Sequence, residues 1–80
     1  MVEVRYFAAI AEATGRDREL IDLPLGATVA DLRYTLAESY GPKLAEMLGY
    51  CAYLVGDELT RDPSTELTLR VDVLPPFAGG

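Results

Sequence analysis

The sequence predicts an α+β fold in which one main helix packs across a single face of a β-sheet. Two observations lead to this prediction. The 80 residues, half of them apolar and a quarter charged, suit one small domain near the lower size limit for folding on a hydrophobic core. Apolar positions recur with strand or helix periods in the order strand, strand, helix, strand, short strand, strand, an order typical of a helix covering one side of a sheet.

The chain begins with two predicted strands separated by a short helical turn. Apolar residues occupy every second position from 2 to 8, which predicts a half-buried strand with Phe7 on its opposite, polar face. Residues 10–14 suit a helical turn closed by Gly15, since glycine adopts the left-handed conformation that ends helices. A second strand is expected at 19–23, before a turn rich in proline and glycine.

The main helix is predicted to begin after Thr28 and to stop at Gly41. Thr28 is a favourable N-cap, and Asp31 three residues later completes a variant of the capping box. Apolar residues then follow at spacings of three and four, which draws one stripe along a helix. The stripe consists of Val29, Leu32, Leu36 and Tyr40.

The second half of the chain is predicted to hold a short helix and three strands. The helix is expected at 43–48, and the strands at 50–55, 58–60 and 67–73. The last strand has the clearest alternation of apolar and polar residues in the sequence, and this alternation predicts one buried face. That face consists of Leu67, Leu69, Val71 and Val73.

The charge balance excludes several classes of partner. Thirteen acidic residues against seven basic ones give a net charge of −6, which disfavours nucleic acid and anionic membranes and favours a basic protein partner. No stretch approaches the roughly 20 apolar residues that span a bilayer, and the N-terminal residues do not form a signal peptide. We therefore expect no nucleic-acid partner, no membrane association and a cytoplasmic location.

The residue types present leave little scope for catalysis by the chain alone. Histidine is absent and Cys51 is the only cysteine, so neither a histidine-activated nucleophile nor a zinc cluster can be assembled. The glycines do not form a dinucleotide or phosphate-binding loop. The apolar surroundings of Cys51 predict a buried, inert thiol. We expect no metal, no bound cofactor and no independent enzyme activity, but a carrier, adaptor or subunit.

The last residues predict a projecting tail. Pro75 and Pro76 cannot continue a central strand and hold the chain in an extended path. Gly79 and Gly80 lack side chains, so a carboxylate on Gly80 would fit a channel too narrow for other residues. Such a tail suits delivery into the active site of another protein, whereas a frayed terminus of no function is the alternative.

The opening Val4-Arg5-Tyr6-Phe7-Ala8, Gly15 and the run Val71–Gly80 together resemble the small sulfur-carrier subunit of molybdopterin synthase over essentially the whole chain. The resemblance implies a ubiquitin-like β-grasp fold, a mixed sheet of about four to five strands with one main helix on one face. Residues 1–74 would form a single β-grasp domain and residues 75–80 a flexible Gly-Gly tail.

The resemblance also implies a chemistry for Gly80. An E1-like activating enzyme would use ATP to adenylate the Gly80 carboxylate, and a sulfur donor protein would then convert it to a thiocarboxylate. The large subunit of molybdopterin synthase would receive the tail, in which Pro75, Pro76, Phe77, Ala78 and Gly79 precede Gly80. The sulfur would pass to cyclic pyranopterin monophosphate. The positions of Phe7 and Leu59 match partner-contact positions of the family, and Leu74 and Phe77 are expected to continue this partner-binding surface toward the tail.

Three alternatives share parts of this pattern. A sulfur carrier of thiamine or cysteine synthesis would have the same fold, tail and activation chemistry. A ubiquitin-like modifier would instead join Gly80 to a lysine of a target protein. A structural interaction domain would leave the tail inert.

Overall fold

A computed structural model describes residues 1–76 and contains one five-stranded sheet in the order β2-β1-β5-β3-β4. The parallel pairing of β1 with β5 and the antiparallel pairing of the other neighbours make it a mixed sheet. The strands are β1 (Val2–Tyr6), β2 (Arg18–Ile21), β3 (Ala52–Val55), β4 (Glu58–Thr60) and β5 (Arg70–Leu74). The predicted mixed sheet is therefore confirmed.

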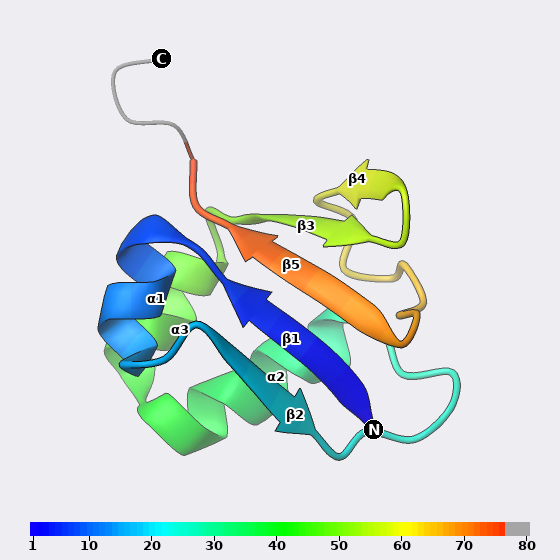
Figure 1. The fold of residues 1–80 in the computed structure, drawn as a ribbon, viewed down its shortest axis with the longest axis horizontal. Helices are drawn as coiled ribbons and strands as arrows, with labels where there is room; N and C mark the ends of the chain where they lie inside the picture. The colour runs from blue at the N-terminus through cyan, green and yellow to red at the C-terminus, as the bar shows by residue number, and fades with distance from the viewer. Residues whose placement is uncertain (77–80) are drawn as a thin grey trace.

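Three helices accompany the sheet: α1 (Ala8–Thr14), α2 (Val29–Tyr40) and α3 (Pro42–Leu48). Figure 1 shows α2, the longest, crossing behind the sheet with α3 beside it, while the other side of the sheet carries no helix in residues 1–76. We call these two sides the helix face and the open face. The main helix on one face is thus also confirmed, and the two short helices predicted at 10–14 and 43–48 form as α1 and α3.

The core lies between the helix face and the helices. β1 contributes Val2, Val4 and Tyr6, and the paired strands contribute Ile21, Tyr53, Val55, Val71 and Val73. The helices contribute Ile10, Val29, Leu32, Leu36, Leu44 and Leu48. In β1, β3 and β5 every second residue therefore enters the core, as the period of a pleated strand requires.

The start of α2 forms as the sequence predicts. The Thr28 backbone N–H donates to Asp31 Oδ2 at 2.9 Å, and the Asp31 N–H donates to Thr28 Oγ1 at 3.3 Å. This reciprocal pair satisfies N–H groups that a helix start leaves unpaired. The stripe of α2 is buried at Val29, Leu32 and Leu36 and half-buried at Tyr40.

A carboxylate links three elements at the edge of the core. Glu19 of β2 accepts hydrogen bonds on Oε1 from the Tyr6 hydroxyl at 2.7 Å and the Tyr40 hydroxyl at 2.8 Å. Arg16 lies 3.6 Å from the other Glu19 oxygen. Glu19 is opposite Val4 in the β1–β2 register and so shares the helix face. The network joins β1, β2 and the end of α2.

The end of β1 and the start of β5 differ from the sequence prediction. β1 stops at Tyr6, and Ala8 begins α1 with a φ of +50°. β5 begins at Arg70 rather than at 67, and Leu69 is 74% exposed rather than inward. The cause is a competing pairing, because the Leu67 N–H donates to the Ala27 carbonyl at 2.8 Å.

Three further strand boundaries, both ends of β2 and the start of β3, move by one or two residues. β2 spans Arg18–Ile21 instead of 19–23. β3 starts at Ala52 rather than 50, because the Tyr50 and Cys51 N–H groups donate to carbonyls of α3, at Met47 and Leu48. Local hydrogen bonds that close a helix thus replace the first pairs of the strand.

The buried tyrosines predict a loss of stability in alkali. Burial raises the pKa of Tyr53 far above its ordinary value of 10, and its hydroxyl donates to the Leu48 carbonyl at 2.7 Å. Above pH 10 the unfolded chain releases a proton that the folded chain keeps, so the free energy of unfolding falls, by at most about 1.4 kcal/mol per pH unit for each such group.

Denaturant unfolding of wild type and Tyr53→Phe between pH 8 and pH 11 checks this expectation. Because Tyr53→Phe removes a hydrogen bond, its free energy of unfolding at pH 8 should be about 1 kcal/mol lower than that of wild type. Above pH 10 its free energy of unfolding should fall less steeply. Tyr34→Phe is the matched control, because Tyr34 is 69% exposed, and its stability should follow that of wild type. Parallel curves for all three proteins would contradict the expectation.

Candidate functional site

A mainly apolar groove of about 690 Å³ lies where the chain leaves the sheet. Figure 1 shows the end of β5 beside the junction of β1 and α1 and the start of β3. The apolar lining residues are Phe7, Ala8, Ala9, Ala52, Leu59, Leu74, Pro75 and Pro76, with Thr60 and Arg61 as the polar ones. Four distant segments therefore build one surface at the base of the predicted tail.

The backbone between β1 and α1 sets the position of Phe7. Phe7 is extended, with φ −129° and ψ 147°, and its carbonyl accepts from the Ile10 N–H at 3.0 Å. The positive φ of Ala8 then turns the chain sharply into α1. Residues other than glycine rarely adopt a positive φ. The Arg5 guanidinium lies 5.5 Å from the centre of the Phe7 ring, in cation–π range.

The strand register brings the other predicted contact residues to the same place. Leu74, the last residue of β5, is opposite Ala52 in β3, and Leu54 of β3 is opposite Leu59 in β4. Leu59 is 62% exposed although it is a large apolar residue. Exposed apolar side chains gathered in one groove are typical of a protein-binding surface.

The two prolines belong to the walls of two grooves. Pro75 and Pro76 line the groove above and also a smaller one of about 270 Å³, which includes Met47, Tyr50 and Cys51. The sequence-predicted contact residues Phe7, Leu59 and Leu74 thus meet the start of the tail. The remaining predicted tail residues, Phe77, Ala78, Gly79 and Gly80, lie outside the described residues.

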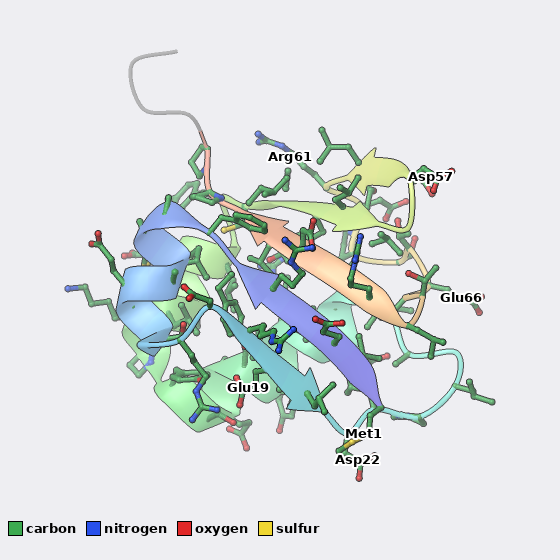
Figure 2. The ribbon with its side chains drawn as sticks, viewed as in Figure 1. Met1, Glu19, Asp22, Asp57, Arg61 and Glu66 are labelled. Carbon is green, nitrogen blue, oxygen red and sulfur yellow. The ribbon has the colours of Figure 1, made fainter. Side chains whose placement is uncertain are left out.

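Several groove residues were not predicted from the sequence. Ala8, Ala9 and Ala52 leave room between the larger side chains, but a small residue gives no signal of its own in a sequence. Arg61 follows the edge strand directly and is exposed, as Figure 2 shows at the top of the view. Its position directly after the short edge strand β4 was the available signal.

Burial is the main influence on the Cys51 thiol. Cys51 is 3% exposed, and its Sγ donates to the Met47 carbonyl at 3.3 Å. Burial raises the pKa of the Cys51 thiol, although Arg33 and Arg61 lower it in part. The prediction of a buried thiol is confirmed. Within residues 1–76, His, Cys, Asp and Glu form no cluster that could hold a metal ion.

The open face carries charged residues next to the groove. Arg18 lies 3.6 Å from Glu3, and Arg5 lies 3.8 Å from Asp72, measured between the closest nitrogen and oxygen. The alternation of β5 predicted Asp72 on a polar face, but the residue is only 9% exposed.

No helix formed by residues 1–76 is long and apolar enough to cross a membrane.

A mixed five-stranded sheet with the main helix across one face, and with the chain leaving beside β1, defines a ubiquitin-like β-grasp protein. Comparison with models of protein families identifies the family of this chain. Residues 4–80 match the model of the ThiS family, so this chain belongs to the ThiS family. No curated protein matches its sequence.

Solved structures share the fold across nearly the whole chain. A putative molybdopterin converting factor subunit 1 from Pyrococcus furiosus is 31% identical with a TM-score of 0.77, over 95% of this chain and 97% of the other. In Helicobacter pylori, a complex of subunits 1 and 2 of molybdopterin-converting factor includes a chain 32% identical, TM-score 0.66, over 99% and 97%. Small archaeal modifier protein 1 from Methanosarcina acetivorans is 27% identical, TM-score 0.74, over 99% and 95%.

The buried position of Cys51 predicts an unreactive thiol. Iodoacetamide at pH 8 should leave the folded protein unmodified over times in which the urea-unfolded protein reacts completely, because alkylation requires an exposed thiolate. Intact mass measures both. Cys51→Ala should lower the free energy of unfolding by about 1 kcal/mol, because it leaves a small cavity. Equal alkylation rates for folded and unfolded protein would contradict a buried thiol.

Proposed function

We propose that this chain is the sulfur-carrier subunit of a molybdopterin synthase, acting through a thiocarboxylate on Gly80. The observation that carries the proposal is the apolar groove at the base of the tail, formed by Phe7, Leu59, Leu74 and the two prolines. Likeness to molybdopterin converting factor subunit 1 supports the same pathway, and one such chain is in complex with subunit 2.

The division of work follows from the chemistry of a carboxylate. An α-carboxyl group with a pKa of about 3.3 to 3.7 is ionised at neutral pH, and the anion resists nucleophilic attack. An E1-like enzyme that joins it to AMP, with loss of pyrophosphate from ATP, supplies a leaving group. Sulfur that a donor protein supplies at the oxidation level of hydrosulfide then attacks the acyl carbon; the carbon–sulfur bond forms, the bond to AMP breaks, and a thiocarboxylate and free AMP are left. The carrier needs neither a cofactor nor a catalytic group of its own.

The docking surface and the tail serve one partner together. The large subunit would cover the groove with an apolar side chain and take residues 77–80 into its active site, where the sulfur goes to cyclic pyranopterin monophosphate. Pro75 and Pro76 make the connection between surface and tail stiff, because their rings fix the backbone. A stiff connection lowers the entropy cost of placing Gly80 in the active site.

A ubiquitin-like modifier is the second candidate function. Likeness to small archaeal modifier protein 1 favours it, since that match covers 99% of this chain. A modifier would appear in cell extracts as a ladder of conjugates joined through Gly80, whereas a carrier would not. A carrier of thiamine or cysteine synthesis would show the thiocarboxylate but would not bind a molybdopterin synthase large subunit.

The role of Gly80 is tested by deleting it. The variant without Gly80 should keep the thermal unfolding of wild type but lose sulfur transfer in a reconstituted synthase, because no carboxyl group would remain at the position that the active site requires. Cys51→Ala is the reciprocal control and should transfer sulfur fully. Intact mass of the protein from its own cells should show oxygen replaced by sulfur. Full activity without Gly80 would refute the carrier function.

The groove is tested at Phe7. Phe7→Ala should weaken binding to the large subunit by roughly 1 to 3 kcal/mol, as truncation of an aromatic anchor does. Isothermal calorimetry gives the dissociation constant, and Tyr34→Ala, an exposed aromatic on α2, is the matched control that should bind normally. Unchanged affinity of Phe7→Ala would leave Phe7 as an ordinary surface residue.

A further inference from the structure

Arg61 is the one charged side chain among the described residues that line the apolar groove. It follows β4 directly and is exposed. Figure 2 shows it at the end of the molecule from which the chain leaves β5. Apart from Thr60, the other described lining residues are apolar. A guanidinium therefore stands beside an apolar wall at the base of the tail.

Within residues 1–76, no carboxylate forms an ion pair with Arg61. The ion pairs of this part of the chain are formed by three other arginines, Arg5, Arg16 and Arg18. The carboxylate next in sequence, Asp62, accepts hydrogen bonds on Oδ1 from the Ser64 backbone N–H at 2.9 Å and from the Ser64 hydroxyl at 2.8 Å. Asp62 is thus held by its own turn, and the Arg61 guanidinium meets water in the free domain.

The surface around the groove is more basic than the chain as a whole. The groove itself has one cation and no acidic residue in its described lining. On the adjoining open face, the strand register places three cations against two acids: Arg5, Arg18 and Arg70 against Glu3 and Asp72. The net charge of −6 therefore arises from acidic residues elsewhere, and a partner that approaches the groove meets a local excess of positive charge.

A protein that covers the groove removes water from the Arg61 guanidinium. Such a loss destabilises the complex unless new hydrogen bonds replace those to water, and arginine cannot escape it by losing its proton. A carboxylate is the best replacement, because it accepts two parallel N–H···O bonds from one guanidinium and charge-assisted bonds are about twice as strong as neutral ones. An arginine beside an apolar anchor is also a typical composition of protein interfaces.

We propose that Arg61 is a specificity contact, which pairs with an aspartate or glutamate of the protein whose apolar side chain occupies the groove. The inference rests on the proposed docking function and adds the chemistry of the partner segment, an apolar residue with a carboxylate next to it. A segment with a lysine or arginine in that place would be rejected by repulsion between like charges. The net charge of −6 attracts a basic partner over a distance, whereas Arg61 selects one acidic residue within its contact surface.

The experiment measures binding of the full chain to the large subunit by calorimetry for wild type, Arg61→Gln, Arg61→Glu and Lys43→Gln. Lys43 is exposed on α3 and lines neither groove at the base of the tail, so Lys43→Gln removes the same charge away from the site. Arg61→Gln should bind about fivefold or more weakly than wild type. Arg61→Glu should bind more weakly again, because it places an acid opposite the partner's carboxylate.

The sign of the effect separates a local pair from the attraction between net charges. Removal of one positive charge makes the chain more acidic, so attraction to a basic partner alone would leave both glutamine variants binding as well as wild type or slightly better. Lys43→Gln should behave in this way, whereas Arg61→Gln should lose affinity. All four proteins should unfold at nearly the same temperature, because both substituted residues are exposed.

Three results would overturn the inference: binding of Arg61→Gln within about twofold of wild type, an equal loss in Lys43→Gln, or equal binding of Arg61→Glu and Arg61→Gln, which would indicate a neutral acceptor such as a backbone carbonyl. If wild type does not bind the large subunit, the proposed function fails separately. The same four proteins are then compared on an E1-like adenylating enzyme, where the absence of an Arg61 effect, or of any binding, overturns the inference as well.

Discussion

The pairing of β5 between β1 and β3 is the constraint on which the rest of this structure depends. β5 is the last strand of the sequence but the middle strand of the sheet, where it pairs parallel with β1 and antiparallel with β3. Val71 and Val73 enter the core from it, while Leu74 and Pro75 leave the sheet from its end. The strand that completes the core thus also fixes the point from which the tail departs.

Local signals were sufficient to predict much of the fold. The capping pair of Thr28 and Asp31 and the stripe along α2 depend on residues near one another in the chain, so sequence alone identifies them. The beginning of β5 depends instead on a distant loop, because the Leu67 N–H pairs with Ala27 and withdraws that segment from the strand. A period of two cannot show where such a competing pair ends the alternation.

The site was predictable to the extent that its residues are large or unusual. Phe7 was identified because an aromatic side chain stood on a polar strand face, and Leu59 because its position matches a partner-contact position of the family that the chain resembles; both line the groove. Ala52 completes the same groove but carries no signal. Asp72 lies on the side of β5 opposite Val71 and Val73, as the alternation predicts, but only 9% of the residue is exposed. Alternation identifies which side a residue takes, not how much of that side is covered.

The position of the groove restricts where a partner can hold its active site. Four residues follow Pro76, and an extended chain of that length reaches at most about 14 Å. Under the proposed function, in which Gly80 reacts, a partner that seats an apolar side chain in the groove would place its reacting atoms within that distance of Pro76. Each residue added between the groove and Gly80 would relax this restriction and raise the entropy cost of insertion. A short stem beside a docking surface consequently selects partners by geometry as well as by contact.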